Sequence, residues 1–316
     1  MYTTPRKLRR GSRVALIAPS SPFIPKEIME GMDIMKEEGL VPVLGPCVRN
    51  LKSDNIHSAP LKDRVQEFNW AFSDPNVEGV FSVGGGAGCA ALLPHVDYHS
   101  IRKSRKAFLG ISDNVALNNG ILAKAGLINF VGQPPCIRVD EGEHLRRADS
   151  ESFQHTIRLL MSNEEWGTKP FNFNESFPRT LCPGTGRGLA VGGNMDTFVH
   201  LIGTPFMPDT VNCVLFLEDV HKNGTSVGRE LLHLRLAGVI SQANAIVLGE
   251  FSEVPNTNDE RTPSIERAIK EYLVPGPPCT YGYPFSHGPY TGPIPIGAMC
   301  DVDATEGVVN FEFAMG

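Results

Sequence analysis

The chain has 316 residues, of which 41% are hydrophobic and 20% charged, and its formal net charge at pH 7 is -6. This is the composition of an ordinary globular protein, and the length suggests about two domains. Because both signs of charge are scattered along the chain, we expect no binding to nucleic acid or to a membrane.

The densest basic stretch, residues 6–13, is expected to be a solvated N-terminal arm (Arg6, Lys7, Arg9, Arg10 and Arg13). The apolar run "VALIAP" is shorter than a signal-peptide core of about 7–15 residues. No run approaches the ~20 apolar residues that cross a bilayer, so we expect a cytoplasmic protein. The seven cysteines lack a C-x-x-C pair. They predict neither a disulfide framework nor a metal site.

In the first half, short apolar runs alternate with stretches of helical periodicity. Strands are expected at 13–19, 40–45, 77–83, 106–111 and 127–132, with helices at 25–39 and 61–74. This alternation is typical of a Rossmann-like, doubly wound parallel sheet. Because sites in such sheets form at the carboxyl ends of the strands, we expect the turns "APSSP", "GGGAG" and "GISDN" to converge there.

From about 163 to 186 the pattern breaks into a segment rich in Pro, Gly and Asn, which predicts a linker. We therefore expect a Rossmann-like domain at 1–165, a linker at 166–186 and a mixed α/β domain at 187–316. In the last of these, strands are expected at 188–194, 212–220 and 244–251, helices at 228–239 and 262–273, and a hairpin at 295–313.

Ser112 follows the fourth expected strand and precedes a helix-like stretch. A serine at such a turn either caps the helix or acts as a nucleophile at the positive end of the helix. In nucleophile elbows the N–H after the serine donates to the oxyanion, but G-I-S-D-N matches only half of G-x-S-x-G. This stretch alone leaves both interpretations open.

The turn "VGGGAGCAALLP" at 83–94 follows the third expected strand. Residues 86–91 fit G-x-G-x-x-A, the weak form of a dinucleotide fingerprint, but the acidic residue expected about 20 positions later is absent. The glycines would still let the backbone approach a ligand and offer N–H donors to a developing negative charge. A tight turn without a ligand is the alternative.

Two further residues carry acid–base chemistry. "LFLEDV" ends a strand with Glu218 and Asp219, and "YGYPFSHGPYTGPIPIG" carries His287 in a loop. Each alone is typical of a solvated side chain. With Ser112 they supply a nucleophile, a carboxylate and a base in a chain order that hydrolases use.

Together these stretches resemble the LD-carboxypeptidase family of serine peptidases, which includes muramoyl-tetrapeptide carboxypeptidases and microcin C immunity peptidases. The likeness covers nearly the whole chain in family order and spacing. Its pieces are "GSRVALIAPSSP", "GGGAGCAALLPHVDY", "GISDNVALNNGILAKAGLINFVGQP", "GGNMDTFVHLIGTPF", "VLFLEDV" and "YGYPFSHGPYTGPIPIG".

The resemblance implies Ser112 as the nucleophile, His287 as the general base and Glu218 as the carboxylate that orients it. It places Ser112 on the N-terminal domain and the other two on the C-terminal domain, with the active site in the interdomain cleft. It also implies a homodimer that needs no cofactor and no metal.

The glycine turn completes the site that the resemblance implies. The backbone N–H groups of Asp113 and Gly86 would bind the oxyanion, and Gly85 and Ala87 would contact the substrate. Many family members have an arginine and an aromatic residue in this turn, and both are missing from residues 84–88. This departure leaves the substrate identity open.

We expect hydrolysis of an L,D-peptide bond in a small peptide or muropeptide, the murein tetrapeptide, with release of C-terminal D-alanine through an acyl-enzyme. One alternative is a peptidase of a peptidyl-nucleotide antibiotic of the microcin C type. Another is a Rossmann-type protein that binds a small ligand without catalysis. The ligand of the substrate's terminal carboxylate stays open between Arg138 and Arg229.

Overall fold

The computed structural model describes residues 2–138, 147–162, 178–255, 261–285, 287–288 and 290–316. The chain forms two compact units. The first contains Met1–Glu164, Gly292–Gly297 and Ala314–Gly316, and the second contains Glu165–Thr291 and Ala298–Phe313. Much of the expected linker lies outside the described residues, and the predicted boundaries at 165 and 186 stay a prediction. Among the described residues, no helix is long and apolar enough to cross a membrane.

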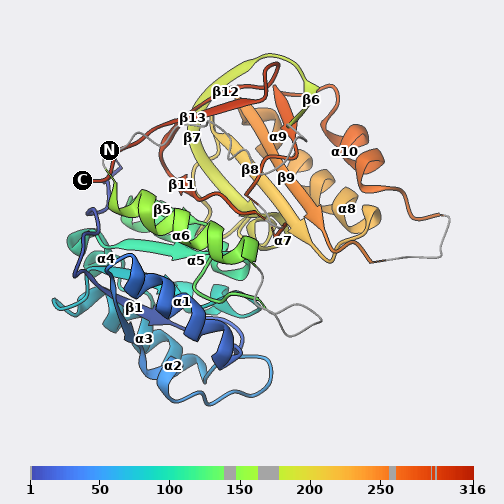
Figure 1. Cartoon of the computed structure of the whole chain (residues 1–316). Helices are drawn as coiled ribbons and strands as arrows, with labels where there is room; N and C mark the ends of the chain where they lie inside the picture. Colours follow the sequence, from blue (N-terminus) through green and yellow to red (C-terminus); the bar gives the residue numbers. More distant parts are fainter. Residues whose placement is uncertain (1, 139–146, 163–177, 256–260, 286, 289) are drawn as a thin grey trace. The chain divides into compact units, whose positions relative to one another are not determined.

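The sheet of the first unit has the strand order β11-β5-β4-β3-β1-β2 (Figure 1). Its strands are β1 (Arg13–Ile17), β2 (Val41–Leu44), β3 (Gly79–Ser82), β4 (Ala107–Gly110), β5 (Asn129–Val131) and β11 (Ile294–Ile296). All pairs are parallel except β11 with β5. The five strands expected in the first half are thus present, and the doubly wound sheet is confirmed.

Helices cover the two faces of this sheet. The described helical elements are α1 (Pro25–Glu37), α2 (Pro46–Arg49), α3 (Leu61–Ser73), η1 (Cys89–His95), α4 (Tyr98–Ser104), η2 (Ser112–Asn114), α5 (Val115–Ala125) and α6 (Arg147–Met161). Contacts join α1 to α6, and separately join α3, α4 and α5 into a second group. Right-handed crossovers place these two groups on opposite faces. Gly39 ends α1 as expected, since its φ of 89° is a left-handed conformation that glycine adopts readily.

Two features of the first unit differ from the expectations. Helix α6 was not identified from the sequence, although Phe153, Ile157 and Leu160 recur at helical spacing and are fully buried. The basic N-terminal stretch is not a solvated arm. The N–H of Leu8 donates to the carbonyl of Leu160 at 3.0 Å, and the Leu8 side chain is 1% exposed. Burial of this leucine holds the segment against the unit.

The second unit is a mixed α/β structure, as predicted. Its sheet has the order β13-β12-β7-β8-β9-β10-β6. The strands are β6 (Arg179–Cys182), β7 (Thr185–Asn194), β8 (Val214–Val220), β9 (Ala245–Ser252), β10 (Cys279–Tyr281), β12 (Met299–Asp303) and β13 (Val308–Glu312). The neighbours from β7 to β10 are parallel, and the other pairs are antiparallel. The hairpin expected at 295–313 is formed by β12 and β13, whereas β11 joins the first sheet.

The helices of the second unit are α7 (Met195–Val199), α8 (Gly224–Leu236), α9 (Val239–Gln242) and α10 (Ile265–Leu273). Helix α8 begins four residues before the expected start, because the side chain of Asn223 accepts a hydrogen bond from the N–H of Ser226 at 3.0 Å and caps it. Ser264 caps α10 in the same way. Such caps satisfy amide donors that lack a partner at the start of a helix.

Aromatic clusters form part of the core. In the first unit, Phe68 packs against Phe72 and Phe108, with ring centroids 5.2 and 5.7 Å apart. In the second, Phe216 packs against Phe285 at 5.6 Å. Aromatic rings bury large areas, and tilted or edge-to-face pairs add to the stability that burial gives.

Phe68 provides a test of this packing, because its side chain is 0% exposed. We expect Phe68→Ala to lower the free energy of unfolding by about 3–5 kcal/mol, since the substitution leaves a cavity in the core. Met29→Ala is the control, because Met29 is 64% exposed. Urea unfolding followed by circular dichroism measures both, and equal losses in the two variants would contradict this view of the core.

Candidate active site

Ser112 lies two residues after the end of β4, at the start of η2 and just before α5. Its φ is 58°, a left-handed backbone conformation that residues other than glycine rarely adopt. Such conformations cost on the order of 1–3 kcal/mol and occur often at functional sites. The strand, the strained serine and the following helix have the arrangement of a nucleophile elbow.

The Ser112 side chain does not cap a helix. Ile111 is the N-cap residue of η2 and Asn114 is the N-cap residue of α5, and neither makes a side-chain cap bond. Among the described residues, the Ser112 hydroxyl has no hydrogen-bond partner. The capping interpretation of Ser112 is therefore wrong, because a cap requires a bond to an amide of the first turn.

The three turns expected to converge do so, and the Asp113 carboxylate joins them. Its Oδ2 accepts hydrogen bonds from the Ser20 hydroxyl at 2.7 Å and from the N–H of Cys89 at 2.8 Å. Ser20 follows β1, Cys89 follows the glycine turn after β3, and Asp113 itself follows β4. One carboxylate therefore holds the turns of three neighbouring strands at the carboxyl edge of the sheet.

The next residue, Asn114, adds a second connection. Its side-chain amide donates to the carbonyls of Gly84 at 2.7 Å and of Ile111 at 3.0 Å. A Cβ atom built on Gly85 would lie 2.6 Å from the Cβ of Ser112, so only glycine fits beside the serine. The glycine turn thus packs directly against Ser112.

Two backbone N–H groups near Ser112 are available as donors. Within the described residues, neither the N–H of Gly86 nor that of Asp113 donates to a protein acceptor. Gly86 has a φ of 116°, which glycine tolerates. The next residue, Ala87, donates its N–H to the Ser21 hydroxyl at 3.0 Å. Within the described residues, the glycine turn therefore has an unbonded donor in the N–H of Gly86. The hydrogen bond of Ala87 to Ser21 fixes the position of the turn.

The glycine turn does not have the structure of a dinucleotide-binding turn. It leads into the 3-10 helix η1, whose N-cap residue Gly88 has a φ of 102°. Dinucleotide folds place the pyrophosphate at the N-terminus of an α-helix after the first strand. The turn here follows β3 and lacks that helix.

In the second unit, Glu218 and His287 form a close pair. The Nδ1 atom of His287 lies 2.8 Å from Oε2 of Glu218. The two side chains are 15% and 4% exposed, in the order His287 and Glu218. A buried carboxylate on Nδ1 fixes the tautomer of the ring and stabilises the imidazolium when Nε2 takes a proton.

The strands on either side of β8 determine the surroundings of the Glu218 side chain. It lies on β8 next to Asn194, the last residue of β7. The register between β8 and β9 shifts between Leu217 and Asp219. A Cβ atom on Gly249 of β9 would lie 3.0 Å from the Cβ of Glu218. The glycine on the neighbouring strand therefore leaves room for the glutamate side chain.

The sequence analysis did not identify a polar network that adjoins Glu218. Asp219 accepts hydrogen bonds from the Asn194 amide at 3.1 Å and from the N–H of Asp196 at 3.0 Å. Lys222 lies 3.0 Å from Asp196 and 3.2 Å from Glu230. The sequence shows that Asp219 follows Glu218. Only the register between β7 and β8 places Asn194 opposite Glu218 and within hydrogen-bond distance of Asp219.

Burial dominates the ionisation of this network. It raises the pKa of Asp219 above its ordinary value. Burial, with the nearby charge of Asp219, also raises the pKa of Glu230 from 4.5 to about 7, against the opposing effect of Lys222. One oxygen of Glu230 is buried without a hydrogen-bond partner among the described residues. Burial therefore favours the protonated form of both carboxyl groups, against the opposing charge of Lys222.

The two arginines considered for the substrate carboxylate differ. Arg138 is engaged with Asp149, since its Nε and an NH2 group lie 2.8 and 2.9 Å from the two carboxylate oxygens. Arg229 is exposed on α8. Where the structure is described, no three His, Cys, Asp or Glu side chains are grouped as a metal site.

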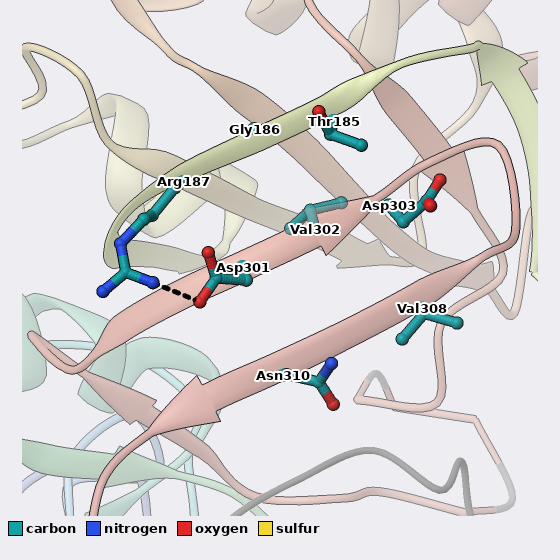
Figure 2. A pocket seen from close by; sticks show the side chains of 8 residues that line it. All are labelled: Thr185, Gly186, Arg187, Asp301, Val302, Asp303, Val308 and Asn310. Atoms are coloured by element: carbon teal, nitrogen blue, oxygen red, sulfur yellow. Dashed lines mark hydrogen bonds and ion pairs between the residues drawn. The ribbon is translucent and has the colours of Figure 1, made fainter.

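A hollow of about 400 Å³ on β7, β12 and β13 contains none of the predicted site residues (Figure 2). Its lining carries Arg187 and Asp301, which form an ion pair of 2.6 Å. Arg187 also pairs with Glu312 at 2.6 Å. The cation of this hollow is already paired with two carboxylates, and its other carboxylate, Asp303, accepts hydrogen bonds from the N–H groups of Thr305 and Glu306.

Known proteins resemble the chain over its whole length. The model of the LD-carboxypeptidase N-terminal domain matches residues 14–132, and that of the C-terminal domain matches residues 187–302. The "Probable murein peptide carboxypeptidase" of Bacillus subtilis is 29% identical, over 96% of this chain and 92% of its own length.

The microcin C7 self-immunity protein MccF of Escherichia coli is 30% identical, over 90% of this chain and 88% of its own. A solved structure of MccF in complex with glutamyl sulfamoyl guanosine superposes with a TM-score of 0.85 at 25% identity, covering 99% of each chain. The chain therefore belongs to the LD-carboxypeptidase family of serine peptidases.

The strain at Ser112 gives a stability test. We expect Ser112→Gly to be more stable than Ser112→Ala by about 0.5–1 kcal/mol. Removing the Cβ relieves the left-handed strain, and the greater freedom of glycine in the unfolded chain offsets only part of that gain. Urea unfolding of the two variants measures the difference, and a less stable Ser112→Gly variant would contradict the strain.

The raised pKa of Glu230 gives a pH test. Because its pKa in the folded protein, about 7, exceeds the ordinary 4.5, the folded state binds the proton more tightly. The stability due to that proton is therefore lost as the pH rises from about 5 to 7. We expect Glu230→Gln to flatten this decline by on the order of 1 kcal/mol. Urea unfolding across this pH range measures it, with the exposed Glu306→Gln as control. An unchanged slope in Glu230→Gln would refute the assignment.

Proposed function

We propose that this protein is a serine carboxypeptidase that hydrolyses the L,D-peptide bond of a murein tetrapeptide and releases D-alanine. The observation that carries the proposal is the 2.8 Å contact between His287 and Glu218, which joins residues 69 positions apart in the sequence. A histidine oriented by a buried carboxylate is the base that an unactivated serine hydroxyl needs.

In the proposed reaction, His287 takes the proton of Ser112 as its Oγ attacks the carbonyl carbon of the scissile bond. Glu218 stabilises the imidazolium that forms. The C–N bond then breaks, the amine of D-alanine receives the proton from His287, and an acyl-enzyme remains on Ser112. Water, deprotonated by His287, attacks the ester and restores the free serine.

The proposed oxyanion donors are the N–H groups of Asp113 and Gly86, with Gly85 and Ala87 contacting the substrate. Their support is local geometry. Both donors lack protein acceptors among the described residues, and Gly85 packs directly against Ser112. Pre-aligned donors of this kind contribute strongly to acyl transfer, because they need no reorganisation when the negative charge develops.

A peptidyl-nucleotide antibiotic of the microcin C type is a second candidate substrate. It is favoured by the 30% identity to MccF and by the TM-score of 0.85 to MccF in complex with glutamyl sulfamoyl guanosine. The same acyl-enzyme chemistry would cleave either substrate. The homodimer, the cytoplasmic location and the absence of a cofactor or metal stay predictions.

The triad is tested on a tetrapeptide that ends in D-alanine, with release of the terminal residue followed by mass spectrometry. We expect Ser112→Ala and His287→Ala each to lower kcat by about 10³-fold or more, since the residues act as one unit. Glu218→Gln is expected to lower it by a similar order, because the ring loses its orientation. A variant that keeps wild-type kcat would remove that residue from the proposed triad.

Matched controls separate chemistry from folding. Ser241→Ala removes an exposed hydroxyl that bonds only within its own turn, and His200→Ala removes an exposed imidazole. Both should keep the wild-type rate. A serine-reactive phosphonate should label Ser112 in the wild type and not in Ser112→Ala.

Substrate choice is decided by running the tetrapeptide beside a glutamyl sulfamoyl nucleoside. Faster turnover of the tetrapeptide supports the first proposal, and cleavage of the nucleoside conjugate alone supports the second. Failure of both substrates with labelling of Ser112 would keep the peptidase and discard both substrates.

A further inference from the structure

The first unit contains a cavity of about 700 Å³ that lies away from Ser112. Among its lining residues, Arg9 lies shortly before β1, Glu78 directly before β3, and Lys106 directly before β4. The cavity is therefore at the amino ends of these parallel strands, whereas Ser112 follows the carboxyl end of β4. With strands of four or five residues, the two edges are roughly 15 Å apart.

The lining is rich in positive charge. Arg6, Lys7, Arg9 and Lys106 all contribute to it, together with the hydroxyl-bearing Ser73 and Ser104. Three of these cations belong to the basic N-terminal stretch, which the structure holds against the unit. Cations on a solvated arm would not be held in one cavity lining with the buried Lys106, so the position of these cations needs a physical explanation.

Two carboxylates in the lining are already committed to protein donors. Asp74 accepts hydrogen bonds from the N–H of Asn76 at 2.8 Å and from the Trp70 ring at 3.1 Å. Glu78 accepts one from the Ser12 hydroxyl at 2.6 Å. Ion pairs between these carboxylates and the lining arginines are absent from the described part of the chain.

The two arginines are left without partners. Among the described residues, the guanidinium groups of Arg6 and Arg9 make no hydrogen bond and no ion pair. Each offers five N–H donors in a planar fork that fits a phosphate or a carboxylate. The two guanidinium groups and the ammonium of Lys106 therefore give the lining three cations that can face a ligand.

Lys106 is a buried cation in this lining, with 6% of its surface exposed. Its ammonium donates to the carbonyls of Ala71 at 2.9 Å and Asp74 at 2.7 Å, at the end of α3. An ammonium has three N–H groups, so one has no protein acceptor among the described residues. Burial lowers the pKa of Lys106 to about 8, against the opposing charge of Asp74, and the positive charge of Arg6 adds to the lowering. A bound anion would favour the charged form of this buried ammonium.

We propose that this cavity binds a small phosphomonoester, with its phosphoryl group held by Arg6, Arg9 and Lys106. A phosphomonoester carries a charge of about −1.5 to −2 near pH 7 and three acceptor oxygens, which complement two guanidinium groups and an ammonium. The volume of about 700 Å³ lies within the range of small-molecule sites and leaves room for an organic portion. Phe72 and Pro75 give that portion an apolar wall.

Calorimetric titration of the full-length protein tests the proposal, with glucose 6-phosphate, inorganic phosphate, citrate and glucose as probes. We expect glucose 6-phosphate to bind more tightly than inorganic phosphate or citrate, and glucose not to bind. The double variant Arg6→Gln/Arg9→Gln should weaken glucose 6-phosphate binding by about tenfold or more, because two charge-assisted contacts are lost. Both arginines are exposed, so the variant is expected to fold.

Two control variants locate the effect. Arg267→Gln removes an exposed arginine of the second unit and should leave the affinity unchanged. Ser112→Ala should also bind as the wild type does, which keeps this site independent of the peptidase proposal.

Three results would overturn the assignment. The wild type could fail to bind glucose 6-phosphate, or it could bind it no more tightly than the double variant does. The wild type could also bind inorganic phosphate or citrate as tightly as glucose 6-phosphate, or more tightly. The last result would mean that the cavity selects a simple anion rather than a phosphomonoester.

Discussion

The Asp113 carboxylate is the constraint on which the first half of the candidate site depends. It accepts hydrogen bonds from Ser20 and Cys89, and so ties together the turns that follow β1, β3 and β4. Parallel strands deliver these turns to one edge of the sheet, but strand geometry alone does not fix their backbones. With the turns tied, Ser112 is held in a left-handed conformation beside Gly85, and its hydroxyl remains unbonded among the described residues.

In the second unit, the main constraint is the burial of two neighbouring carboxylates, Glu218 and Asp219. Glu218 gains room from Gly249 on the neighbouring strand and a partner in His287. Beside it, Asp219 is satisfied by Asn194 and by the backbone of Asp196. Burial of carboxylates is costly unless they are paired or hydrogen-bonded, so adjacent acids on one strand require this separate set of partners.

The sheet of the first unit presents two chemically different edges. Its carboxyl edge carries Ser112 and amide donors, and its amino edge carries a cavity lined by arginines, neither group having a protein partner in the part of the chain that the structure describes. The two share strands but no side chains. Polar groups can gather independently at the two edges, because each strand end carries its own turn and its own side chains.

The sequence by itself determined the alternation of β1 to β5 with their helices, because buried strands and amphipathic helices leave different apolar periods. Its motifs also determined the family and singled out Ser112, Glu218 and His287. Only the tertiary structure decided that Ser112 is not a helix cap. It also decided that β11 pairs with β5 in the sheet of the first unit, and that Asn194 donates a hydrogen bond to Asp219. It also decided that the basic stretch at residues 6–13 packs against the first unit. These outcomes depend on hydrogen bonds and strand register between residues far apart in the chain, and no local pattern encodes them.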